Sequence, residues 1–171
     1  MNFYGFAANN PLNKFDLLGL SEQDVTAILN QFNKTMAELC KKKKRCDCPV
    51  GALKDIHALC SSVLGCAAQA DTMEGDIIAL LPNLDDKWLT DHRRYLEVWP
   101  CFYHQDVKIT PLAPQPAGPD GYIVDNIVLD TFRGCYYITR RKMIFIEPNP
   151  QQSFWLYSYE NKCFTCEDFK K

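Results

Sequence analysis

Hydrophobic residues near the start of the chain recur at three- and four-residue spacing, which is typical of a helix that buries one face. The first such run covers residues 21–40, and its apolar positions are Val25, Ile28, Leu29, Phe32, Met36 and Leu39. Ser21 precedes a first turn that contains Glu22 and Asp24, which suits the positive end of a helix dipole. The pattern therefore predicts an amphipathic helix over 21–40.

Three more helices are predicted before the pattern changes. Pro49 fits the first position of a helix, where a missing amide hydrogen costs nothing, and helical spacing then continues to residue 64. A short helix around 74–81 ends at Pro82, and a further helix covers 85–95.

Beyond residue 95, β-branched and aromatic residues indicate strands. The predicted strands are 96–99, 103–110, 122–129, 135–146 and 154–159. Prolines and glycines between residues 111 and 121 mark the turn between the second and third of them. Helices followed by strands predict an α+β fold, with N-terminal helices packed on a C-terminal antiparallel sheet.

Composition narrows the classes of partner. The chain has 171 residues, 47% of them hydrophobic, which is enough for one compact domain with a core. Its net charge of −2 gives no general attraction to phosphate backbones. The basic run at 41–45 fits the solvated end of a helix, where cations complement the dipole. We therefore expect no nucleic-acid partner.

A sequence motif, rather than a periodicity, stands out in residues 4–20, which read YGFAANNPLNKFDLLGL. They resemble the closing motif of the Rhs/YD-repeat core, roughly YxYxxNNPxNxxDPxGL, with Asn13, Asp16 and the final Gly-Leu in register. Leu17 stands where that family usually has proline. In the family, an internal acidic-residue protease often cuts after the last Leu, so Asp16 matches a functional position and the cut would follow Leu20.

The resemblance implies two parts, a core remnant in residues 1–20 and a C-terminal effector domain, most often a toxin, in residues 21–171. It also implies two protein partners, the Rhs core of the parent protein and a cognate immunity protein. No run of roughly eighteen apolar residues and no N-terminal signal peptide is present, so we expect no membrane-spanning segment. Secretion, or delivery into a target cell, would then occur as part of a larger exported protein.

Nine cysteines leave one thiol over if all the others pair. Disulfide-bonded cysteines are typical of proteins in an oxidising compartment, and reduced cysteines are typical of cytoplasmic proteins. The sequence leaves both redox states open. An alternative to disulfides is a zinc site built from two cysteine pairs, Cys46-Asp-Cys48 and Cys163-Phe-Thr-Cys166. These pairs lie far apart in the chain. We expect disulfides or buried thiols, with no metal and no cofactor.

The candidate catalytic residues are Cys48, His104 and Asp125. We expect His104 to open one strand and Asp125, 21 residues later, to close the next, so a hairpin could place them side by side as base and orienting carboxylate. Cys48 precedes Pro49, and a thiol at a helix N-terminus has a lowered pKa. This order resembles the papain-like and transglutaminase-like folds and implies a cysteine hydrolase or acyl transferase with a protein substrate. Cys60 and Cys66 are rival nucleophiles.

Two other functions stay open. A nuclease-type toxin would use the cluster Asp91-His92-Arg93-Arg94, although neighbouring residues on a helix point in different directions. A non-catalytic, disulfide-stabilised binding module would leave His104 and Asp125 as exposed strand ends. The chain has no glycine-rich phosphate loop, HExxH motif or GxSxG motif.

Overall fold

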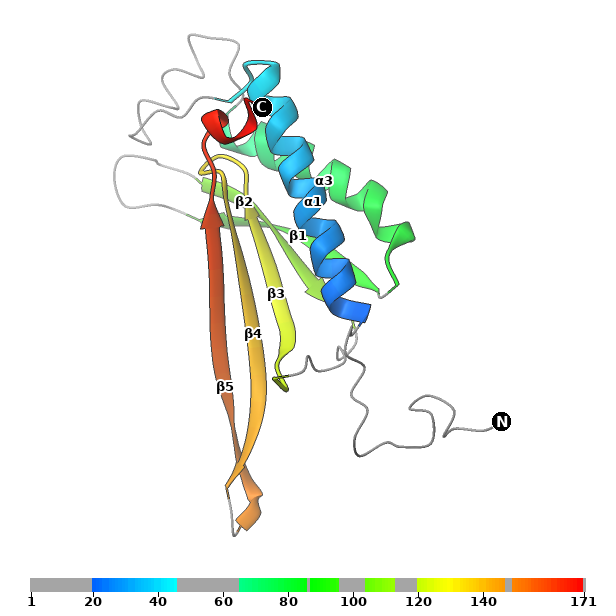
Figure 1. Cartoon of the computed structure of the whole chain (residues 1–171), viewed down its shortest axis with the longest axis vertical. Coiled ribbons are helices and arrows are strands. Elements are labelled where there is room, and N and C mark those ends of the chain that lie inside the picture. Colours follow the sequence, from blue (N-terminus) through cyan, green and yellow to red (C-terminus); the bar gives the residue numbers. More distant parts are fainter. Residues whose placement is uncertain are drawn as a thin grey trace.

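The computed structural model describes residues 20–45, 65–85, 87–95, 104–112, 120–146 and 149–170. In this part of the chain, two helices pack on one face of a five-stranded antiparallel sheet (Figure 1). The α+β class and the packing of the helices on the sheet are thus confirmed. The finer papain-like assignment stays a prediction.

Helix α1 (Leu20–Lys41) matches the predicted segment 21–40 closely. Its predicted apolar face is the buried one, because Ile28, Phe32 and Met36 have no exposed surface. Helix α3 (Cys66–Leu80) begins earlier than the predicted 74–81 segment. Its first half is alanine-rich, so it has high helix propensity but little apolar periodicity. The predicted helix from Pro49 to residue 64 lies outside the described residues.

The predicted helix over 85–95 is wrong, because this segment contains strand β1 (Trp88–Tyr95). Strand β1 pairs with β2 along its whole length, from Trp88 opposite Pro111 to Tyr95 opposite His104. Trp88 is buried, and its indole Nε1 donates to Asp24 Oδ2 of α1 at 2.8 Å. Polar residues fill most of β1, so the sequence lacks the apolar alternation that marks a half-buried strand.

The sheet is a meander in the order β1-β2-β3-β4-β5. After β1 come β2 (His104–Pro111), β3 (Ile123–Asp130), β4 (Cys135–Ile146) and β5 (Asn149–Cys163). The predicted strands 103–110 and 122–129 correspond to β2 and β3 with a shift of one residue, 135–146 matches β4 at both ends, and 154–159 falls within β5. The predicted strand 96–99 lies outside the described residues.

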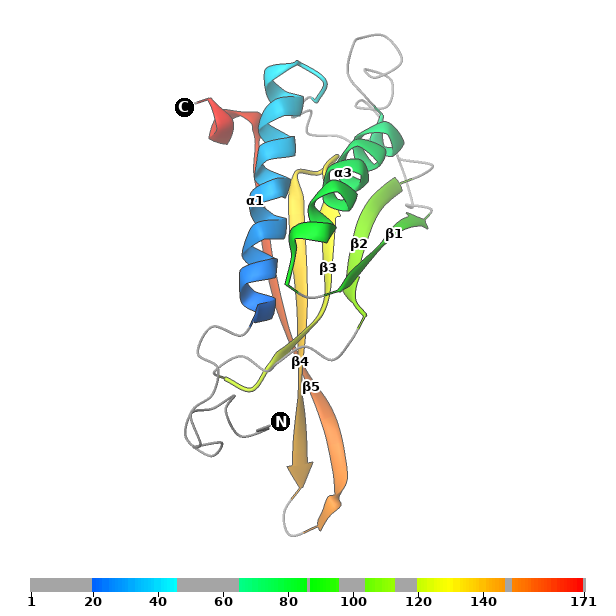
Figure 2. The ribbon, with the colours of Figure 1, turned by 90° about the vertical axis from the view of Figure 1, so that its right-hand side faces the viewer.

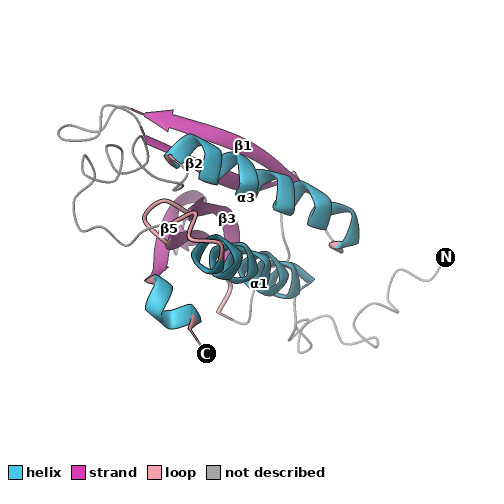
Figure 3. Ribbon diagram, turned by 90° about the horizontal axis from the view of Figure 1, so that it is seen from above, coloured by secondary structure: helices cyan, strands magenta, loops and turns pink. Residues whose placement is uncertain are grey.

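Helices α1 and α3 lie on the same face of the sheet (Figures 2 and 3). Helix α3 packs on β1 and β2 and also contacts α1. Side chains from both helices and from β1 to β4 form a single apolar core, which includes Phe32, Met73, Trp88, Ile109, Leu129 and Ile138.

The β4–β5 hairpin extends beyond this core. Strand β3 pairs with β4 only as far as Ile123 opposite Arg141, so the remainder of the hairpin is a two-stranded ribbon (Figure 1). Large apolar side chains are exposed along it, among them Phe145, Phe154 and Trp155.

Two disulfides cross-link the described chain, Cys40–Cys166 and Cys135–Cys163. The expectation of disulfides is therefore confirmed for these four cysteines, and both members of the 163–166 pair are unavailable to zinc. Among the described residues, no group of three or more His, Cys, Asp or Glu is arranged to hold a metal ion. Disulfides are compatible with an extracellular or secreted protein. Neither described helix combines the length and apolarity needed to cross a membrane.

Candidate functional site

A buried histidine–aspartate pair forms the candidate site. His104 begins β2 and Asp130 ends β3, and each side chain is only 1% exposed. His104 Nε2 lies 2.9 Å from Asp130 Oδ2. Antiparallel pairing explains the contact, because it places the start of one strand beside the end of the next.

The turn after β3 holds the Asp130 carboxylate in place. The backbone N–H of Arg133 donates to Asp130 Oδ1 at 2.9 Å, and the Arg133 side-chain Nε lies 3.6 Å from Oδ2. The N–H of Gly134 donates to the Asp130 carbonyl at 2.8 Å. Phe132, in the same turn, packs its ring 6.0 Å from the His104 ring. Both carboxylate oxygens of Asp130 are therefore engaged, one of them by His104.

The contact with Asp130 fixes the orientation of the His104 ring. An ionised carboxylate only accepts hydrogen bonds, so a His104 bonded to it donates from Nε2. An imidazole oriented by a carboxylate is one part of the arrangement that general-base catalysis uses.

The structure does not bring His104 and Asp125 together. Val107 pairs with Leu129 and Ile109 with Ile127, so Asp125 lies toward the end of the β2–β3 pair that is remote from His104. Asp125 Oδ1 instead lies 3.1 Å from Arg141 Nε, and Asn126 Nδ2 donates to Oδ2 at 3.0 Å. In this position Asp125 joins β3 to β4.

The sequence contained a signal for Asp130 that the prediction missed. The predicted strand 122–129 ends one residue before Asp130, whereas Asp125 falls inside that strand. Start-to-end pairing of antiparallel strands therefore favours Asp130 over Asp125, and the observed register of β2 and β3 makes the contact.

Of the candidate nucleophiles, Cys48 and its rival Cys60 lie outside the described residues. Cys66, the other rival, begins α3 directly after Gly65. Its side chain is buried, and α3 packs on β1 and β2.

The cluster proposed for a nuclease does not converge, because β1 is a strand and its side chains alternate between faces. His92 Nε2 lies 3.0 Å from Glu74 Oε2 of α3, on the helix-covered face. Arg93 belongs to the other face, where its Nε and Nη2 donate to the two oxygens of Asp106 at 2.7 and 2.6 Å. The cluster thus contributes to two separate structural contacts.

Gln105 shows which way His104 faces. Gln105 Nε2 lies 2.9 Å from His92 Nδ1 and 3.4 Å from Asp71 Oδ1 of α3, so Gln105 points toward the helices. His104, its neighbour, therefore points to the opposite face, which it shares with Asp106. The His104–Asp130 pair and the Arg93–Asp106 pair lie on this face.

The groups with shifted pKa values lie on the other face and bind α1 to the sheet. Burial raises the pKa of Tyr136, and the nearby Glu160 carboxylate raises it further. Burial lowers the pKa of Arg140, but hydrogen bonds to Glu22 and Glu160 outweigh this and raise it overall. Arg140 bridges Glu22 of α1 and Glu160 of β5, at 3.2 and 2.8 Å.

In comparisons with known proteins, neither a family model, nor a curated protein, nor a solved structure matches the chain.

Proposed function

We propose that residues 21–171 form the effector domain that follows an Rhs-type core, and that this domain is a cysteine-dependent hydrolase or acyl transferase. The observation that carries the proposal is the fully buried contact between His104 and Asp130 at 2.9 Å. His104 is the general base, and Asp130 is the residue that positions it. Asp130 takes the role that the sequence pattern assigned to Asp125.

Each residue has a defined step in the proposed reaction. His104 removes the proton of the cysteine thiol, and the thiolate attacks the carbonyl carbon of a protein amide. The imidazolium then gives this proton to the departing amine, which leaves a thioester on the enzyme. His104 next deprotonates water, or a second amine, which attacks the thioester and regenerates the thiol.

Cys48 is the proposed nucleophile and Cys66 its rival. The position of Cys48 before Pro49 favours it, because the first turn of a helix stabilises a thiolate. The chain order of cysteine, histidine and aspartate agrees with the papain-like resemblance. The two disulfides agree with a domain that is exported.

The first prediction compares two aspartates. Asp130→Asn should lower growth inhibition by the expressed chain, or its hydrolysis of a protein substrate, by roughly 10²- to 10⁴-fold, because the imidazole loses its orienting charge. Asp125→Asn is the matched control on the same strand and should leave activity within about twofold. Circular dichroism of both purified variants establishes that each is folded. Equal activity of the two variants would contradict the assignment of Asp130.

The nucleophile is identified by Cys48→Ala and Cys66→Ala in the same assay. Loss with Cys48→Ala alone supports the proposed reaction. The rate of iodoacetamide labelling between pH 5 and 9 then measures the thiol pKa, which we expect to lie below its ordinary value of about 8.5. Full activity in both variants would rule out a nucleophile at either position.

A second candidate function is a non-catalytic binding module, which the disulfides Cys40–Cys166 and Cys135–Cys163 favour. Such a module needs no reactive thiol. Thiol counting on the native protein separates the two functions: a rapidly labelled cysteine supports the enzyme, and its absence supports the module.

A further inference from the structure

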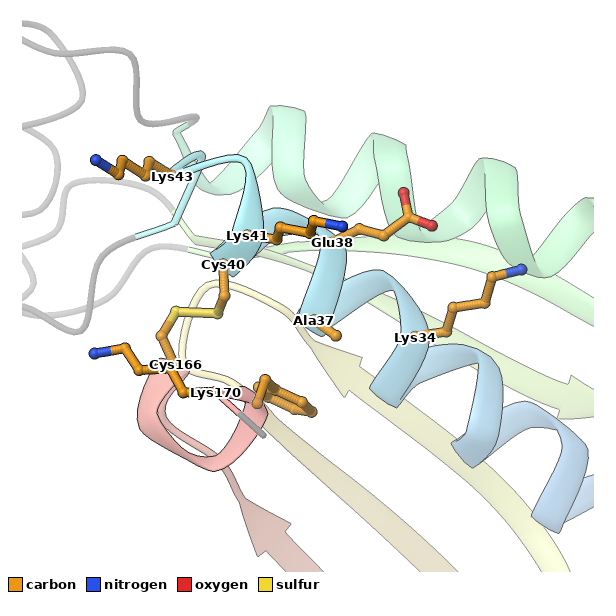
Figure 4. A pocket seen from close by; sticks show the side chains of 9 residues that line it. Lys34, Ala37, Glu38, Cys40, Lys41, Lys43, Cys166 and Lys170 are labelled. Carbon is orange, nitrogen blue, oxygen red and sulfur yellow. A yellow bond between two sulfur atoms is a disulfide. The ribbon is translucent and has the colours of Figure 1, made fainter.

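A groove of about 680 Å³ lies between the C-terminal end of α1 and the short helix η3 (Cys166–Phe169) (Figure 4). The side chains that line it are Lys34, Ala37, Glu38, Cys40, Lys41, Lys43, Cys166, Phe169 and Lys170. Apolar surface comes from Ala37, Phe169 and the Cys40–Cys166 disulfide. We name this cavity the α1–η3 groove.

The rim of the α1–η3 groove is positively charged. Four lysines and the carboxylate of Glu38 line it, and one of these lysines, Lys170, also forms an ion pair with Glu167 of η3. Glu38 Oε2 already accepts a hydrogen bond from Lys42 Nζ at 3.1 Å. The lysine-rich end of α1 therefore concentrates positive charge on a chain whose net charge is −2.

One lysine of the rim has an uncommon backbone conformation. Lys43 has a φ of 54°, in the left-handed region where glycine is usual. The N–H of Lys43 donates to the Cys40 carbonyl at 3.0 Å, and that of Lys44 donates to the Leu39 carbonyl at 2.8 Å. These two hydrogen bonds form a Schellman cap, which glycine would make with less strain. A lysine at this position places a charge on the rim at a cost to the helix cap.

The disulfide joins the two walls of the groove. Cys40 lies at the end of α1 and Cys166 begins η3, 126 residues later (Figure 4). Reduction removes this covalent link, so the shape of the groove depends on the redox state of the pair.

The surroundings of the groove favour a protein segment over a nucleic acid. Glu167 and Asp168 of η3, which pair with Lys170 and Thr165, interrupt the positive surface that a continuous phosphate backbone would follow. A peptide carries separate carboxylates, which can avoid these positions, and an apolar side chain that can contact Ala37 and Phe169. We propose that the α1–η3 groove binds an acidic segment of a partner protein, anchored by an apolar side chain, and that it does so only when Cys40 and Cys166 are oxidised.

The probe for this proposal is a fluorescein-labelled twelve-residue peptide of glutamate with leucine at every fourth position. Its affinity for the oxidised full-length chain is measured by fluorescence anisotropy. The double variant Lys34→Glu/Lys170→Glu should weaken binding by about tenfold or more. Lys87→Glu, an exposed lysine outside the groove, is the matched control and should leave affinity unchanged.

Lys43→Gly separates binding from stability. This variant should raise the melting temperature by roughly 2–4 °C, because the cap is relieved of strain. It should at the same time weaken peptide binding, because a charge leaves the rim. If the variant lost binding because it folded poorly, both its melting temperature and its affinity for the peptide would fall.

The redox dependence is tested with the double variant Cys40→Ser/Cys166→Ser, whose folding is checked by circular dichroism. This variant should lose peptide binding. Unchanged binding by this folded variant would overturn the redox part of the proposal. Equal effects of the groove and control lysines would overturn the site itself. Tighter binding of a twelve-nucleotide oligothymidylate than of the peptide, with the same lysine dependence, would overturn the choice of partner and assign the groove to nucleic acid.

Discussion

Gly134 closes the turn between β3 and β4 in a way that no other residue can. Its φ is 77°, and a Cβ atom there would meet the Phe164 carbonyl oxygen and, at 2.5 Å, Nη2 of Arg45. The Gly134 carbonyl accepts a hydrogen bond from Phe164, and buried Arg45 donates from Nε to the Thr131 carbonyl. This one glycine thus supports the turn that orients Asp130.

At the residue scale, we predict that Gly134→Ala lowers the free energy of unfolding by roughly 2–4 kcal/mol, from the left-handed backbone plus the clash with backbone and buried guanidinium. Gly121→Ala is the control. Its φ is also positive, at 79°, but its Cβ would meet only the flexible end of Lys142. We expect a loss of about 1 kcal/mol there. Urea denaturation measures both, and equal losses would contradict the steric argument.

At the scale of helices and strands, the two disulfides join different parts of the fold. Cys135–Cys163 joins residues that already pair across β4 and β5, so it reinforces an existing hairpin. Cys40–Cys166 joins the end of α1 to η3 and closes a far longer loop, with a separation of 126 residues against 28. It attaches the end of the chain to the helical layer.

At the element scale, removal of Cys40–Cys166 should therefore destabilise the fold more than removal of Cys135–Cys163. Chain entropy gives about 5 kcal/mol for the longer loop and about 3.5 kcal/mol for the shorter one. Thermal unfolding of Cys40→Ala/Cys166→Ala and of Cys135→Ala/Cys163→Ala measures the order. A lower melting temperature for the second variant would show that native-state packing dominates over chain entropy.

For the whole molecule, the sequence predicts a boundary between residues 20 and 21. Helix α1 (Leu20–Lys41) contributes Val25, Ile28 and Phe32 to the shared core. The predicted boundary can be tested by deletion.

We predict that a chain starting at Ser21 folds with both disulfides and melts within about 2 °C of the full chain, because it keeps every core residue that the structure describes, from Val25 onward. Deletion of residues 1–32 is the control and should abolish cooperative unfolding, because it removes fully buried Ile28 and Phe32. Differential scanning calorimetry compares the three chains. A large loss from the shorter deletion would place the boundary inside residues 1–20.

Apolar spacing predicted the buried face of α1 because that helix buries a regular stripe, and a run of β-branched and aromatic residues predicted the bounds of β4. It failed for β1, whose sequence WLTDHRRY is mostly polar. Its inward positions contact α3 and α1 through polar groups, such as His92 with Glu74 and Trp88 with Asp24. Periodicity does not detect a strand whose contacts are polar.

The sequence by itself determined the class of fold, the helix α1 and the bounds of the strand β4. These properties depend on local spacing and on turn residues. Only the tertiary structure decided that His104 pairs with Asp130, and that Cys40 meets Cys166. Strand register and long-range loop closure select those partners, and both depend on how the whole chain packs.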